Sequence, residues 1–144
     1  MALRDKLREV VAIKDSPRRI ATSFAVGIFI GMSPALGLHT ALGIAAAWLF
    51  GLNKFATLIG VFITNPWTII PIYSFSTWVG AKVLRVERII PAVNWNDATL
   101  VTVMHNMKPL FWPFVCGTTL VGLFSAVLAY VIIYHAVERN KKSE

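Results

Sequence analysis

The chain has 144 residues, of which 56% are hydrophobic and only 15% are charged. A typical soluble domain has about 45–50% apolar and about 25% charged residues, so this composition argues against a soluble protein. The formal net charge is +7, but no basic stretch is interleaved with aromatic residues as in surfaces that bind single-stranded nucleic acid. We therefore expect no nucleic acid among the partners.

Three stretches carry no formal charge: residues 20–53, 55–81 and 109–137. Each is longer than the ~18 apolar residues that indicate a transmembrane candidate. The core of a soluble all-α protein is the alternative, and runs of this length argue against it. We predict a single-domain, all-α integral membrane protein, built from proline-broken helical hairpins and a C-terminal transmembrane helix.

Residues 1–15 combine an apolar helical face, formed by Leu3, Leu7, Val10 and Val11, with a face of mixed charge. This pattern predicts an amphipathic interfacial helix, or a helix that packs on a neighbouring subunit. A cleaved signal peptide is not expected, because the apolar sequence continues far beyond any cleavage point.

Ser16 and Pro17 have the pattern of a helix start, with serine as the N-cap and proline at the first helical position. Arg18 and Arg19 follow in the first turn, where the helix dipole disfavours cations. This conflict indicates that the two arginines contact a lipid or a ligand. Simple anchoring of the topology is the alternative.

The first broken helical segment covers residues 16–53. Its apolar part, residues 20–50, would be roughly 46 Å long as one helix, whereas the hydrocarbon core of a bilayer is ~30 Å thick. Two full spans and a turn would need more than ~40 residues. Ser33-Pro34 divides the run near its middle, so a long kinked helix and a re-entrant hairpin both fit.

The second broken helical segment covers residues 54–81 and is divided at Asn65-Pro66. Overlaying the two segments with an offset of 32 residues matches Ser33-Pro34 to Asn65-Pro66. Duplicated broken helices are a recognised transporter pattern, and coincidence of two prolines is the alternative.

Residues 82–108 form a more polar, interfacial connection, in which Asn94 or Asn96 is expected to cap a short helix that begins at Asp97. Residues 109–137 then form the C-terminal span. Its residues 117–122, which begin and end with glycine, provide a small-residue face for close helix packing together with Ser125 and Ala126.

The orientation depends on how many runs cross the membrane. Three simple spans would place the two basic ends of the chain on opposite sides, against the positive-inside rule. One re-entrant run returns both ends to the cytoplasm and leaves Lys82, Arg85 and Arg88 outside. We predict cytoplasmic termini.

The sequence offers no catalytic or metal-binding constellation. All seven acidic residues lie outside the apolar runs, and the three histidines lack metal-ligand spacing. Ser33 and His39 have no accompanying acid and no nucleophile-elbow motif. We therefore expect a protein that is not an enzyme and that needs no metal or cofactor.

The candidate binding residues are uncharged polar groups at the breaks and cations near the ends of the runs. The N-terminus of a half-helix exposes N–H groups that attract an anion. The alternatives are that the breaks only kink helices, and that Lys54 is a snorkelling anchor. The predicted substrate-binding residues are Ser33, Pro34, His39, Thr40, Asn65, Pro66, Thr68, Arg18, Arg19 and Lys54.

Several of these motifs together resemble a bacterial family known as domain of unknown function 2062 (DUF2062). The matching residues are Ser16-Pro17-Arg18-Arg19, Gly27, Gly31, Ser33-Pro34, His39-Thr40, Asn53, Asn65-Pro66, Pro71, Tyr73 and Gly80. The resemblance covers about residues 16–136. It departs at His39, where glutamine is more frequent in the family, which weighs against a proton-relay role for this histidine.

The resemblance implies a small, multi-pass protein of the bacterial inner membrane, with a role in lipid or lipid-linked sugar metabolism. Some members of the family are joined to domains similar to polyprenyl-phosphate glycosyltransferases. Such a lipid-linked glycosyltransferase is therefore a candidate partner.

Three functions are compatible with the sequence. The first is binding or translocation of an amphiphilic anion, such as a phospholipid or polyprenyl phosphate, at a site between the two breaks. The second is a non-catalytic adaptor for a glycosyltransferase or another envelope-biogenesis partner, and the third is an oligomeric channel for small solutes. Membrane lipids are expected partners in each case. A homo-oligomer is also expected, because few spans are available to bury the breaks.

Overall fold

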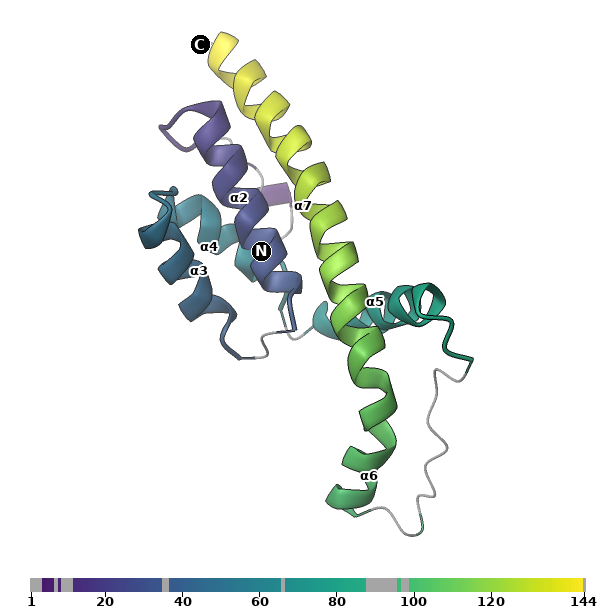
Figure 1. The fold of residues 1–144 in the computed structure, drawn as a ribbon. Helices are drawn as coiled ribbons and strands as arrows, with labels where there is room; N and C mark the ends of the chain where they lie inside the picture. Colours follow the sequence, from purple (N-terminus) through teal and green to yellow (C-terminus); the bar gives the residue numbers. More distant parts are fainter. Residues whose placement is uncertain are drawn as a thin grey trace.

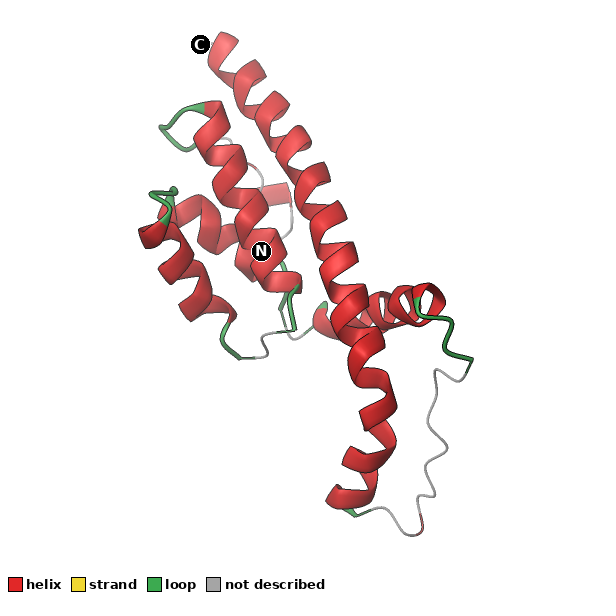
Figure 2. Ribbon diagram, in the orientation of Figure 1, coloured by secondary structure: helices red, strands yellow, loops and turns green. Residues whose placement is uncertain are grey.

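The computed structural model describes residues 4–6, 8, 12–34, 37–65, 67–87, 96 and 99–143. These residues form helices and no strand, which confirms the all-helical class (Figure 2). The helices, labelled in Figure 1, are α2 (Pro17–Met32), α3 (His39–Leu49), α4 (Lys54–Phe62), α5 (Ile69–Val83), α6 (Leu100–Met107) and α7 (Phe111–Lys142), with a 3-10 turn, η2, at Lys108–Leu110.

Local capping explains where α2 begins and ends. The Ser16 hydroxyl accepts a hydrogen bond from the Arg19 N–H at 3.2 Å, and Pro17 occupies the first turn, so the predicted helix start is confirmed. At the other end, the Ser33 hydroxyl donates to the Ile30 carbonyl at 2.6 Å. Pro34 follows and has no N–H with which to continue the helix.

The first apolar run folds back on itself. The backbone N–H of Asn53, after the run, donates to the Ser23 hydroxyl at 2.8 Å, and Arg19 Nε donates to the Gly51 carbonyl at 3.1 Å. These bonds join the end of the run to its beginning, and Figure 1 shows α2 and α3 running in opposite directions. The run is therefore a hairpin and not a single kinked helix.

The second run takes a different course after its break. The helix α4 begins with the Asn53 side chain, which accepts from the Ala56 N–H at 3.0 Å, and it packs along α2. The helix α5 then leaves this bundle and crosses α7 (Figure 1). The two halves of the second run thus pack on different partners, α4 on α2 and α5 on α7.

Two helix crossings depend on glycine. A Cβ on Gly60 of α4 would lie 2.5 Å from the Phe24 carbonyl oxygen of α2, which is too close for any side chain. At the second crossing, a Cβ on Gly80 of α5 or on Gly117 of α7 would collide with the backbone of the opposite helix. The prediction that residues 117–122 pack closely is confirmed, since Gly122 lies against Phe29 of α2.

The hydrophobic core lies between α2, α4 and α7. Ile20, Phe24 and Ile28 of α2 pack with Ile59 of α4 and with two buried residues of α7, Ile133 and Val137. The contact between the first turns of α2 and the last turns of α7 places residues 17 and 142 at the same end of the bundle (Figure 1).

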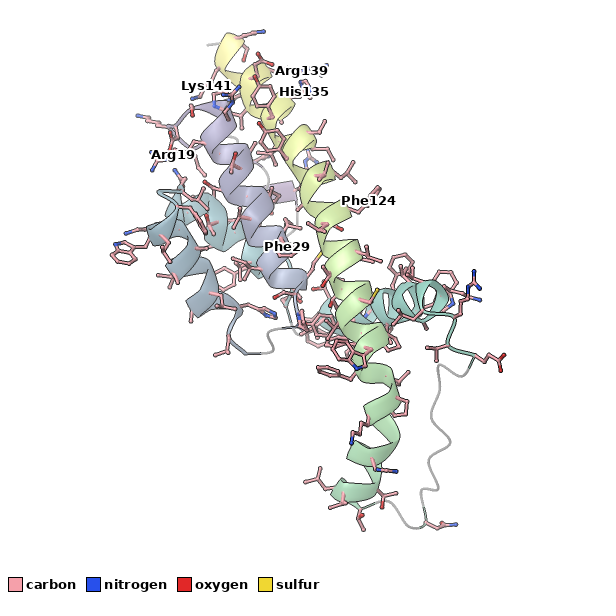
Figure 3. The ribbon with its side chains drawn as sticks, viewed as in Figure 1. Arg19, Phe29, Phe124, His135, Arg139 and Lys141 are labelled. Atoms are coloured by element: carbon pink, nitrogen blue, oxygen red, sulfur yellow. The ribbon has the colours of Figure 1, made fainter. Side chains whose placement is uncertain are left out.

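The outer face of α7 is apolar and uncovered. Among the described residues, one helical stretch, Lys108–Lys142, is long and apolar enough to cross a membrane by its length and composition. Only 17% of its most apolar 18-residue stretch is buried. The uncovered side chains of this face include Leu123, Phe124, Val127 and Leu128. Phe124 points away from α2 in Figure 3.

The crossing of α5 and α7 gives a stability test. Gly117→Ala is expected to destabilise the fold, because overpacking typically costs about 1–3 kcal/mol. Gly122→Ala is the matched control in the same helix. It has the same gain in helix propensity, and its Cβ would meet the Phe29 ring at 3.3 Å, where a side chain can shift. Equilibrium unfolding in detergent should give a lower free energy of unfolding for Gly117→Ala than for Gly122→Ala. Equal free energies of unfolding would contradict the close crossing.

Candidate functional site

Three polar groups meet where the first apolar run breaks. The Tyr73 hydroxyl of α5 donates to the Ser33 carbonyl at 2.9 Å, and His39 Nε2 lies 3.1 Å from the same oxygen. A carbonyl oxygen only accepts, so a hydrogen bond at this contact requires the proton of the imidazole on Nε2. The Tyr73 oxygen is also 3.4 Å from His39 Nε2. We call Ser33, His39 and Tyr73 the break cluster.

The break cluster lies beside the N-terminus of α3. Leu38 precedes this helix and provides no side-chain cap for its first turn, whereas Ser16 and Asn53 cap α2 and α4. The first N–H groups of a helix have no partner within the helix and carry positive partial charge. Thr40 adds an exposed hydroxyl in this first turn. The start of α3 is therefore chemically suited to an acceptor group such as a phosphate oxygen.

The second break satisfies its own backbone groups. The Asn65 side chain accepts from the N–H groups of Trp67 and Thr68, at 2.9 and 3.1 Å. In return, the Thr68 hydroxyl accepts from the Asn65 N–H at 2.9 Å and donates to the Ile63 carbonyl at 2.9 Å. This reciprocal arrangement is a capping box in form. Asn65 and Thr68 thus start the turn that leads into α5.

The two breaks are neighbours in space. A Cβ on Gly31, in the last turn of α2, would lie 3.1 Å from the Thr64 hydroxyl of the second break. The described part of the N-terminal segment also reaches this end, since Lys6 Nζ donates to the Phe62 carbonyl at 3.4 Å. The end of the bundle that contains both breaks is called the break end below.

A second polar cluster closes the opposite end of the hairpin. Asp15 accepts from the Asn53 side-chain amide at 3.2 Å and from the Ser16 N–H at 2.8 Å, and it forms an ion pair with Arg19 at 3.4 Å. Arg19 also reaches the Gly51 carbonyl. These bonds join the start of α2 to the loop before α4, and this end of the bundle is called the basic end.

The surroundings of Asp15 favour its ionised form. Burial raises the pKa of the Asp15 carboxyl, but the hydrogen bonds from Asn53 and Ser16 and the charges of Arg19 and Lys141 outweigh this effect. The pKa of Asp15 therefore lies below its usual value of 3.8. Lys141 belongs to α7, so the same carboxylate also attracts the C-terminal helix (Figure 3).

The structure separates the predicted binding residues into two groups. Ser33, Pro34, His39, Thr40, Asn65 and Thr68 lie at the break end, whereas Arg18, Arg19 and Lys54 lie at the basic end. The 16 residues of α2 between the two ends correspond to about 24 Å. A single small headgroup cannot contact both groups. Pro66 lies outside the described residues.

Sequence reasoning did not place Tyr73, Lys6 or Asp15 in a site. Tyr73 was visible as the tyrosine of a long uncharged run, where a buried hydroxyl needs a partner. Asp15 had a weaker signal, as an acid directly before a helix start. No local pattern marked Lys6, because its partner Phe62 is 56 positions away.

The chemistry available at the break end is recognition by hydrogen bonding. The described residues contain no group of three or more His, Cys, Asp or Glu that could hold a metal ion. The Ser33 hydroxyl donates to Ile30, and its carbonyl is occupied by two donors. The donors that the described residues offer here are the first N–H groups of α3, which have no partner within the helix, and the Thr40 hydroxyl.

The basic end predicts a pH dependence of stability. Because the folded pKa of Asp15 is lower than its unfolded pKa, the ionised carboxylate stabilises the fold above about pH 3.8, and this contribution is lost as the pH falls through the folded pKa. Asp15→Asn should lower Tm at pH 7 and have a smaller effect at pH 2.5, as measured by thermal unfolding in detergent. Glu87→Gln, at an exposed position, is the control. An equal loss of Tm at both pH values would contradict this role of Asp15.

Comparison with known families gives one match. A bacterial family described as "Uncharacterized protein conserved in bacteria (DUF2062)" matches residues 1–144. No curated protein and no solved structure gives a match. The family predicted from the motifs between Ser16 and Gly80 is thus confirmed: the chain belongs to the bacterial DUF2062 family.

Proposed function

We propose that this protein is embedded in the bacterial inner membrane and is anchored there by α7. The support is the uncovered apolar face of α7 and the spacing of its aromatic residues. Trp112 and Tyr134 are 22 residues apart, which corresponds to about 33 Å along a helix and is close to the ~30 Å of a hydrocarbon core. Tryptophan and tyrosine favour the two membrane interfaces, and Arg139 and Lys141 follow Tyr134.

This placement sets the depth of the break end. The rings of Tyr73 and Phe114 make an edge-to-face contact at 4.9 Å, so the break cluster lies nearly level with Trp112. The helix α5 crosses α7 at this level, and Lys82 lies 5.7 Å from the centre of the Trp78 ring. A helix that ends with a tryptophan and a lysine suits the interface. The break end then faces the headgroups of the leaflet opposite the basic end, and not the middle of the bilayer.

Labelling of single cysteines in a Cys116→Ala background tests this topology. Cysteines at positions 18 and 142 should react with a membrane-impermeant maleimide from one side of the membrane, and a cysteine at position 85 should react from the other side. Reaction of positions 18 and 85 from the same side would contradict the placement. A cysteine at position 5 tests the Lys6 contact, which predicts reaction from the side of position 85. Positions 5 and 142 would then lie on opposite sides, unlike the two cytoplasmic termini expected from the sequence.

Within this placement, we propose that the protein binds an amphiphilic anion with a phosphate headgroup at the break end. The observation that carries the proposal is the N-terminus of α3, which has no side-chain cap and lies beside the break cluster. Its N–H groups and Thr40 would bind phosphate oxygens, and His39 would position the turn. Lys6 supplies a positive charge at the same end.

An amphiphile fits better than a small soluble anion because of the apolar side chains around the break end. Trp67 is 90% exposed and Ile70 is 71% exposed, and both lie between the second break and the first turn of α5. Trp112 and Phe111 are also exposed at this level of α7. A lipid or polyprenyl chain would cover these side chains while its headgroup reached α3.

A pair of probes that differ only in the phosphate gives a direct test. Farnesyl phosphate is expected to bind the detergent-solubilised protein about tenfold more tightly than farnesol, a difference of about 1.4 kcal/mol. Thr40→Val and Lys6→Gln should each reduce this preference severalfold, because each removes a donor or a charge from the break end. Isothermal titration calorimetry measures both affinities.

The control is Thr119→Val, which removes an exposed hydroxyl of α7 outside both ends and should leave the preference unchanged. Equal affinities for farnesyl phosphate and farnesol in the wild-type protein would refute phosphate binding. A loss of preference in Lys54→Gln, with none in Thr40→Val, would move the site to the basic end.

A further inference from the structure

The basic end gathers positive charge from segments that are far apart in the sequence. Its cations come from the loop before α2, from the first turns of α2 and α4, and from the last turns of α7 (Figure 3). They are Lys14, Arg18, Arg19, Lys54, Arg139, Lys141 and Lys142. Among the described residues, the acids at this end are Asp15 and Glu138. No single segment of the sequence carries this cluster; folding assembles it.

Most of this charge is not neutralised within the chain. Arg19 pairs with Asp15 at 3.4 Å, and Lys142 pairs with Glu138 at 3.5 Å. In the described part of the chain the other cations of the cluster form no ion pair within 4.0 Å: Lys14, Arg18, Lys54, Arg139 and Lys141. The N-termini of α2 and α4 also point to this end and add positive partial charge.

Exposed aromatic side chains border the cations. Trp48 is 76% exposed and Phe50 is 73% exposed at the C-terminus of α3, next to the Gly51 carbonyl that Arg19 binds. Phe55 is exposed in the first turn of α4, beside Lys54. Cations next to apolar rings match the boundary between lipid headgroups and acyl chains, where tryptophan is favoured and phosphates are within reach of lysine and arginine.

We propose that the basic end binds the anionic lipid headgroups of the leaflet that contacts it, and that it selects them over zwitterionic headgroups. This inference rests on the membrane placement proposed above, but not on the phosphate site at the break end. An anionic lipid surface and an acidic protein would both match the charge of this end. The lipid surface fits better, because the exposed rings would enter its acyl region and would otherwise remain in water. Arg18, Lys54 and Lys141 are the contacts, whereas Arg19 holds the hairpin closed.

Quenching of tryptophan fluorescence by brominated lipids tests the selection. A variant that keeps Trp48 as its only tryptophan is reconstituted into vesicles of phosphatidylglycerol and phosphatidylcholine, with one lipid brominated at a time. Brominated phosphatidylglycerol should associate with Trp48 about two- to fivefold more strongly than brominated phosphatidylcholine, and 0.5 M salt should reduce the ratio. Substitution of Arg18, Lys54 and Lys141 by glutamine should bring the ratio to about one.

The matched control replaces Lys82 and Arg85 by glutamine, which removes cations from the other end and should leave the ratio unchanged. Native mass spectrometry of the wild-type protein provides a second measurement without tryptophan substitutions, through the ratio of the two lipids that remain bound. Equal association of the two lipids with the wild-type protein would overturn the proposal. An acidic protein would then be the better candidate partner of these cations. A preference that survives the triple substitution would overturn it as well. The losses of preference expected for Thr40→Val and Lys6→Gln in the farnesyl phosphate test report on the break end and do not depend on either result.

Discussion

Breaking an apolar helix leaves backbone N–H and C=O groups without partners, and this constraint governs the arrangement of the whole protein. At the first break the Ser33 carbonyl receives bonds from Tyr73 and His39, so α5 must pass close to the end of α2. At the second break Asn65 and Thr68 satisfy each other. The Ser33 carbonyl and the polar groups of Asn65 and Thr68 thus find partners within one chain. Burial of the breaks is therefore not a reason for a second copy, although an oligomer stays a prediction.

The features that could be predicted from the sequence are those set by neighbours in the chain. Ser16 and Pro17 form a start signal whose atoms lie within one turn of each other, and the charge-free runs show that the elements are apolar helices. The choice between a kinked helix and a hairpin could not be made, because it depends on bonds such as Asn53 to Ser23, across 30 positions. Tyr73 and Lys6 were missed for the same reason: their partners are set by how the helices pack, not by local pattern.

The division of the candidate residues into two ends changes what each can do. Cations and half-helix ends were expected to act on one headgroup, but α2 holds them about 24 Å apart. The break end offers neutral donors and little charge, which suits the recognition of one headgroup by hydrogen bonds. The basic end offers many cations and few directed donors, which suits a charged surface. In the membrane placement that we propose, the protein would recognise one leaflet by geometry and the other by electrostatics.

The side chain of Asn65 alters how mutations at the second break should be understood. Its amide oxygen already occupies the N–H groups of Trp67 and Thr68, which an incoming anion would otherwise approach. Replacing Asn65 by alanine would remove a cap, with a typical cost of about 1 kcal/mol, and would at the same time uncover those N–H groups. A phenotype at position 65 would therefore report first on the integrity of the turn, and a gain in anion affinity there would be as informative as a loss. Asn65 resembles an internal competitor for an anion more than a ligand-binding residue.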